Sequence, residues 1–111
     1  MAQAGNLLET LPPATGEERF DTLLLSATVR IERIVSHGEC SPEGFWYDQK
    51  EDEWVVVLSG AARLAFDNGE EVALEPGGYC HLPARCRHRV AWTDPGQPTV
   101  WLAFFFPPQT A

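Results

Sequence analysis

Apolar and polar residues alternate along the chain after its first 21 residues. In the segment 29–35, for example, Val29 and Ile31 alternate with Arg30 and Glu32. A period of two residues is typical of a β-strand with one buried and one exposed face. Because no segment with the period of a helix follows, the pattern predicts an all-β fold.

Short strand-like runs, separated by turn residues, continue to the end of the chain. Beyond residue 35 these runs are 44–48, 54–58, 62–66, 71–75, 79–82, 88–92 and 99–106. The separators contain Gly or Asn, which tolerate the positive φ that tight turns require. Asn68-Gly69, between two alternating runs, predicts a β-hairpin. About eight or nine short strands in one small chain predict a closed or nearly closed antiparallel barrel.

The length of 111 residues indicates one domain. Residues 1–21 are predicted to form a short N-terminal leader, and residues 22–111 a single barrel domain. No apolar run approaches the roughly 20 residues needed to span a bilayer, and the N-terminus lacks the basic and apolar regions of a signal peptide. We therefore expect a soluble, cytoplasmic protein.

The chain is acidic, with 8 Lys and Arg against 16 Asp and Glu and a formal net charge of -8. This balance repels the phosphates of nucleic acids and of anionic lipids, so neither nucleic acid nor a membrane is expected as a partner. The three cysteines form no CxxC pair, which argues against a disulfide framework and against a cysteine-based zinc site.

Two segments place ionisable residues at strand ends, beside turns. In the first, 44–60, Glu53 precedes an apolar run that ends at Gly60; in the second, 76–88, the matching residues are Gly77, Pro83 and His88. Together they resemble the two conserved motifs of the cupin superfamily, and more narrowly those of small single-domain bacterial cupins of the cupin 2 conserved-barrel type. The resemblance extends over residues 29–106 and implies a jelly-roll β-barrel.

The chain departs from the first cupin motif at its His-x-His pair, because counting back from Glu53 places Tyr47 and Gln49 there. A full cupin site offers three imidazoles and a carboxylate to iron, manganese, nickel or zinc. Here only Glu53 and His88 keep their type, and Gln49 offers a weaker carbonyl oxygen. The resemblance therefore implies Gln49, Glu53 and His88 as metal ligands for one divalent ion, or a site that holds none.

The second motif departs less, with Arg85 in place of its second glycine and Trp92 in place of its final asparagine. His88 shares its parity with Val90, and the flanking arginines take the opposite parity, so we expect His88 to point inward. Candidate ligand-binding residues are Tyr47, as a hydrogen-bond donor to substrate, and the remaining histidines, His81 and His37.

Three functional interpretations stay open. In the first, the barrel binds a small molecule around a divalent metal that polarises a substrate oxygen or activates water or dioxygen. In the second, a metal-free binding or sensing module uses His88 and Glu53 as a hydrogen-bonded pair or as acid and base. In the third, the protein is an assembly module without catalysis, paired through the apolar run 100–106. The resemblance implies a homodimer under all three.

Overall fold

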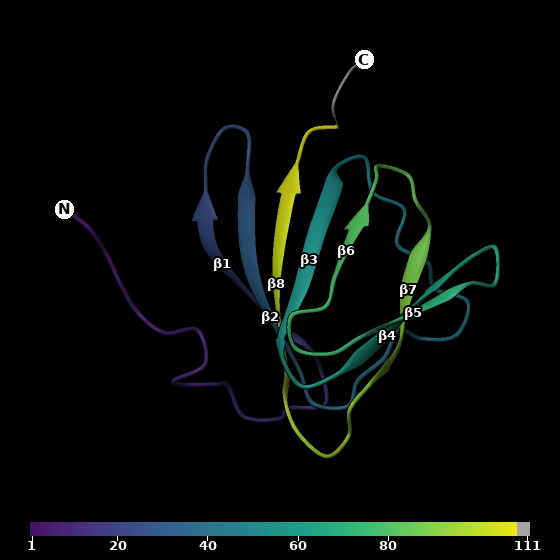
Figure 1. The fold of residues 1–111 in the computed structure, drawn as a ribbon, viewed down its shortest axis with the longest axis horizontal. Helices are drawn as coiled ribbons and strands as arrows, with labels where there is room; N and C mark the ends of the chain where they lie inside the picture. Colours follow the sequence, from purple (N-terminus) through teal and green to yellow (C-terminus); the bar gives the residue numbers. More distant parts are fainter. Residues whose placement is uncertain (109–111) are drawn as a thin grey trace.

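The computed structural model describes residues 1–108 and contains eight strands and no helix in that range (Figure 1). The strands are β1 (Arg19–Leu25), β2 (Arg30–Ser36), β3 (Asp52–Ser59), β4 (Ala62–Phe66), β5 (Glu71–Leu74), β6 (Tyr79–Leu82), β7 (His88–Thr93) and β8 (Thr99–Phe106). The all-β prediction is therefore confirmed. No described residue belongs to a helix long and apolar enough to cross a membrane.

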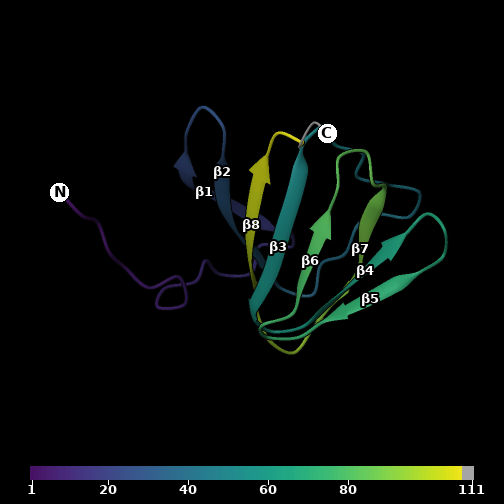
Figure 2. The same ribbon diagram turned by 45° about the horizontal axis from the view of Figure 1, so that its top comes forward.

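Two antiparallel sheets make up the molecule. The first has the strand order β1-β2-β8-β3-β6 and the second the order β5-β4-β7. In both views the sheets are inclined to each other, with β6 of the first beside β7 of the second (Figures 1 and 2). Side chains from the facing sides of the two sheets pack into one core, as in a jelly roll.

Most strand predictions agree with the structure, and the predicted hairpin is confirmed. Between β4 and β5, Gly69 has a φ of 91° and the Phe66 amide donates to the Glu70 carbonyl. The predicted strand 44–48 is wrong. This segment is a loop in which only Tyr47 pairs with a strand residue, His88, because Gly44 at φ 81° and a turn at Pro42 interrupt extended backbone.

Strand β1 begins at Arg19, inside the predicted leader, and pairs with β2 along its length. The segment before it also contacts the barrel, because Arg33 donates to the carbonyl oxygens of Leu7 and Thr10. The first 21 residues therefore contribute the start of the edge strand β1 and two hydrogen-bond acceptors for Arg33 of β2.

The alternation in β2 predicts that its apolar face points inward, but in the structure the other face does. Arg30, Glu32 and Ile34 line the space between the sheets, whereas Val35 on the opposite face is also fully buried. Since both faces of β2 are covered at this end, the rule that the apolar parity faces inward fails here. This orientation brings two charged side chains into the barrel.

Positive φ angles occur at one position in each motif region, Gly60 and Arg85. Gly60 has a φ of 85°, and a Cβ at this position would lie 2.6 Å from the Pro98 carbonyl oxygen. Arg85, in place of the second motif's glycine, has a φ of 66°. Its amide donates to the Gln49 carbonyl, so the turn holds the loop that carries Gln49 against the barrel.

Candidate functional site

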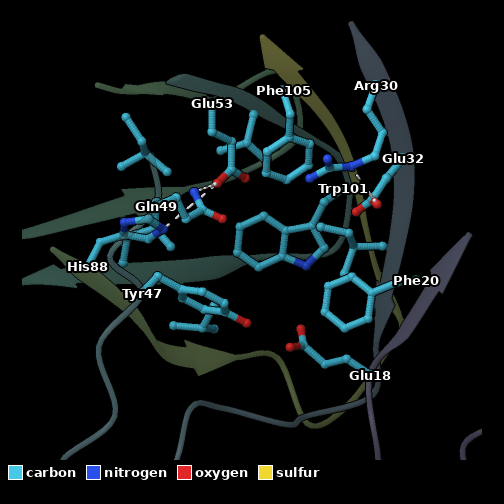
Figure 3. Close-up of a pocket in the computed structure, with 15 residues that line it drawn as sticks. Glu18, Phe20, Arg30, Glu32, Tyr47, Gln49, Glu53, His88, Trp101 and Phe105 are labelled. Atoms are coloured by element: carbon cyan, nitrogen blue, oxygen red, sulfur yellow. Dashed lines mark hydrogen bonds and ion pairs between the residues drawn. The ribbon is translucent and has the colours of Figure 1, made fainter. Parts of the chain in front are cut away.

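A cavity of about 170 Å³ lies between the two sheets and is lined by 15 residues (Figure 3). Its apolar walls come from core side chains of both sheets: Ile34, Val55, Leu64, Leu82, Val90 and Phe105. The remaining lining residues are polar or aromatic: Glu18, Phe20, Arg30, Glu32, Tyr47, Gln49, Glu53, His88 and Trp101. Three carboxylates and one guanidinium therefore face a hollow whose walls are otherwise largely apolar or aromatic.

Glu53, Gln49 and His88 form a polar cluster on one side of this cavity (Figure 3). Glu53 comes from β3 and His88 from the start of β7, so the cluster joins the two sheets. The Gln49 amide donates to Glu53 Oε1 at 3.1 Å, and His88 Nε2 lies 3.8 Å from the same oxygen, longer than a hydrogen bond. Glu53 is 7% exposed and His88 is 4% exposed.

Two neighbours fix the orientation of the His88 ring. Its Nδ1 donates to the Cys86 carbonyl oxygen at 2.8 Å, which leaves Nε2 with a lone pair directed toward the cavity. One ring face stacks on Tyr47 with centroids 5.2 Å apart. Burial lowers the pKa of His88, and the bond to Cys86 only partly offsets this effect, so the imidazole favours its neutral form.

The Glu53 carboxyl also favours its neutral form. Burial raises its pKa to about 7; the charges of Glu32 and Glu51 add to this rise, while the bond from Gln49 and the charge of Arg30 oppose it. Because burial shifts the pKa values of Glu53 and His88 in opposite directions, the two side chains do not form a stable ion pair.

Arg30 is the only arginine or lysine among the described residues that line the cavity. Its guanidinium donates to Glu32 at 3.0 Å and to both carboxylate oxygens of Glu51 at 3.3 Å each. It also lies over the ring of Phe105, 4.2 Å from the centroid. Two carboxylates therefore already compensate the charge of Arg30.

Glu18 reaches the cavity from just before β1. It accepts a hydrogen bond from the Ser36 hydroxyl, whose oxygen in turn accepts one from the Trp101 indole at 3.1 Å. Burial raises the pKa of Glu18. Burial and the charges of Glu18 and Glu53 raise the pKa of the Tyr47 phenol, so this hydroxyl lies in the negative field of both carboxylates.

The donor set does not fit a cupin metal centre. Within residues 1–108, no group of three or more His, Cys, Asp or Glu side chains is placed to hold a metal ion. One imidazole and one carboxylate remain, and the amide that replaces a motif histidine is already engaged with Glu53. Phenol and amide oxygens are weak ligands for iron, manganese, nickel and zinc compared with imidazole.

The structure brings four of the predicted site residues together in this cavity: Tyr47, Gln49, Glu53 and His88. His81 lies outside it, because its neighbour Leu82 takes the inward position of β6; the His81 side chain is 50% exposed, with Nε2 3.2 Å from Asp52. His37 also lies outside, and its Nε2 contacts the Pro12 carbonyl oxygen at 3.0 Å. The structure therefore gives these two histidines no part in the cavity.

The sequence analysis missed Glu18, Arg30, Glu32 and Trp101 as lining residues. Arg30 and Glu32 were on the face of β2 that its alternation marks as polar, and Glu18 was within the predicted leader. Trp101 was in an apolar run that is simplest to interpret as core. The one available signal was the parity of Ile34, which shares a face with Arg30 and Glu32.

The comparisons with known proteins agree with this geometry. The family model for the cupin domain matches residues 33–105, and the chain belongs to that family. A protein from Ralstonia eutropha with the description "putative mannose-6-phosphate isomerase" is 47% identical over 96% of this chain and 99% of that chain, with a TM-score of 0.91.

More distant solved structures show the same fold. A cupin superfamily protein from Desulfitobacterium hafniense is 18% identical, covering 87% of this chain and 84% of its own, with a TM-score of 0.72. An RmlC-like cupin from Desulfovibrio desulfuricans is 17% identical, covering 98% and 100%, with a TM-score of 0.74. No curated protein matches the chain. The resemblance to cupins and the jelly-roll prediction are confirmed.

Proposed function

We propose that this cupin binds a small organic molecule in the cavity between its sheets, and that it does so without a metal ion. One observation carries the proposal: His88 lines the cavity, and no hydrogen bond is formed by its Nε2 among the described residues, the Glu53 Oε1 atom lying 3.8 Å away. A ring nitrogen that makes no hydrogen bond within the protein can accept one from a ligand in the cavity. The Glu53 carboxyl, 3.8 Å away, lies within reach of the same ligand.

The shape of the site supports binding of a small molecule. The walls are mainly apolar, and the few polar groups converge from different strands, as in ligand sites generally. A volume of about 170 Å³ favours a compact ligand over a nucleotide or an oligosaccharide.

The metal-dependent interpretation has weaker support. With Tyr47 and Gln49 at the two motif histidine positions, one imidazole and one carboxyl group remain, and the pKa of that Glu53 carboxyl is raised. A metal needs the carboxylate ionised and competes with a proton for it. We therefore assign no step to a metal.

The description of the Ralstonia eutropha protein refers to a sugar phosphate. A phosphate group is normally held by cationic side chains or by a cluster of backbone amides. In this chain Arg30 is already paired with Glu32 and Glu51. We therefore do not extend that substrate to this cavity.

The proposal can be tested by NMR screening of neutral, cationic and anionic fragments against isotope-labelled protein. Bound fragments should shift the indole N–H signal of Trp101 and the ring signals of Tyr47, which both line the cavity. The variant His88→Gln should lose these shifts. The matched control, His81→Ala, alters a histidine outside the cavity and should retain them.

Two results would overturn the proposal. One is a set of fragments that perturbs only the outer surface, around Tyr79 and His81. The other is unchanged binding to a folded His88→Gln variant.

A further inference from the structure

The charges around the cavity are strongly unbalanced. Of the three carboxyl groups that line it, Glu32 is paired with Arg30 and Glu53 favours its neutral form, which leaves Glu18 without a cationic partner. Because Arg30 is also paired with Glu51, outside the lining, no cationic charge is left for a ligand. Glu18 takes part in none of the ion pairs among the described residues.

The carboxylate of Glu18 lies beside aromatic side chains. Its Ser36 partner also binds the Trp101 indole, which ties the carboxylate to the edge of that ring. Figure 3 shows Tyr47, Trp101 and Phe20 around the same part of the hollow, with Glu18 at its margin. Aromatic rings beside a carboxylate recognise organic ammonium ions, because both supply negative potential.

The opposite side of the cavity offers a different contact. There His88 Nε2, on a side chain that is 5% exposed, faces the hollow without a partner among residues 1–108. With its proton on Nδ1, this nitrogen accepts a hydrogen bond from a ligand hydroxyl. The Glu53 carboxyl lies beside it and can accept or donate.

We infer that the ligand is a small organic ammonium ion that also carries a hydroxyl group. The ammonium group would lie among Glu18, Tyr47 and Trp101, and the hydroxyl would face His88. The inference rests on the proposed function, because it specifies the chemistry of the same cavity. The inferred site should bind a cation more tightly than neutral or anionic molecules of the same shape.

Three probes of nearly identical shape test the inference by calorimetric titration at pH 8. Choline is the cation, 3,3-dimethylbutan-1-ol is its neutral isostere, and 3,3-dimethylbutanoate is the corresponding anion. Choline should bind about tenfold tighter than the alcohol, a gain typical of a desolvated cation–π site. The anion should give no binding signal.

A charge-removing variant locates the ammonium group. Glu18→Gln preserves an oxygen that accepts from Ser36, so the fold has no reason to change. It should lower choline affinity about tenfold and leave binding of the alcohol unchanged. The control Glu17→Gln removes the neighbouring exposed charge and should change neither affinity.

The outcomes separate this inference from the proposed function. Equal binding of choline and the alcohol, with both lost in His88→Gln, would overturn the charge preference and keep the proposed function. Absence of choline binding, or an unchanged preference in Glu18→Gln, would also overturn the inference. Choline binding that is unchanged in both Glu18→Gln and His88→Gln would show that choline binds outside the cavity.

Discussion

Tyr47 and His88 are joined twice, through their rings and through their backbones. The rings stack with an interplanar angle of 21°, and the two residues exchange backbone hydrogen bonds of 2.7 Å and 3.2 Å. Since Tyr47 belongs to a loop and His88 to β7, this pair fixes the loop over the buried imidazole. The site histidine is therefore shielded by a residue that occupies a former ligand position of the family motif.

Replacing Tyr47 should expose His88 to water. In Tyr47→Ala we expect the pKa of His88 to rise toward its ordinary value, because the burial that lowers it is reduced. The lost stacking should also lower the free energy of unfolding by about 1 kcal/mol. NMR titration of the imidazole signals measures the first effect. Tyr47→Phe keeps the ring and should leave the His88 pKa in place; an equal shift in both variants would contradict the shielding role.

The raised pKa of Glu53 predicts a pH-dependent stability. Between pH 4.5 and about 7 the unfolded carboxyl ionises while the folded one keeps its proton, so this group's contribution to stability falls as pH rises. Glu53→Gln removes this dependence, and relative to wild type its free energy of unfolding should increase by as much as about 3 kcal/mol from pH 4 to pH 8. His88 acts in the opposite sense, because its lowered pKa makes stability rise with pH up to its unfolded pKa.

Urea unfolding at several pH values measures this difference. Because His88 lies 3.8 Å from Glu53, the same comparison in a His88→Gln background separates the Glu53 contribution from that of His88. The control Glu71→Gln changes an exposed carboxylate of β5 and should parallel wild type. Parallel curves for wild type and Glu53→Gln would show that Glu53 titrates as in the unfolded chain.

Arg85 stores backbone strain that a glycine would remove. Its φ of 66° lies in the left-handed region, which costs a non-glycine residue about 1 kcal/mol. Arg85→Gly should therefore raise the free energy of unfolding by about 0.5 to 1 kcal/mol, because the exposed pair with Asp48 that it removes contributes little. Arg87→Gly, at a position without positive φ, should destabilise the protein. A destabilised Arg85→Gly would contradict this account.

Metal content tests the metal-free interpretation directly. After incubation with iron, manganese, nickel or zinc, wild type and His88→Ala should both hold far less than one ion per chain by elemental analysis. The double variant Tyr47→His and Gln49→His restores the motif's imidazole pair in the same cavity and should bind zinc. Near-stoichiometric metal in wild type that disappears in a folded His88→Ala would establish a metal-dependent cupin instead.

The expected homodimer can be tested on the outer face of the five-stranded sheet. There Trp54 stacks on Tyr79, which is 62% exposed, and contacts Phe104 edge to face. We propose that a second copy covers this aromatic row. Light scattering should find a dimer that Phe104→Glu converts to a folded monomer, while Ala73→Glu on the other sheet has no effect. A dimeric Phe104→Glu protein would exclude this face.

The fold was predictable because short alternating runs and glycine-rich turns repeat along the chain. The cluster of Glu53 and His88 was predictable from the spacing of the two motifs, because that spacing is kept although two of the motif's metal ligands are replaced. Arg30 was not, since local alternation does not tell which face of β2 turns inward when both faces are covered. Glu18 was not either, because it precedes β1 in the predicted leader. The prediction of His81 as a ligand-binding residue was wrong for a related reason. Proximity to a motif does not determine which side chains of a strand point inward, and in β6 Leu82 takes the inward position.

The family model begins at residue 33, whereas Glu18, Phe20, Arg30 and Glu32 all line the cavity from earlier positions. The cavity is therefore lined by residues from two parts of the chain: the part that the family model matches supplies His88 and Glu53, and the part before it supplies Glu18 and Arg30. Exchanging residues 1–32 between members of the family would alter ligand preference while leaving the motif untouched. Sorting such proteins by motif alone would leave out four of the residues that line the cavity in this chain.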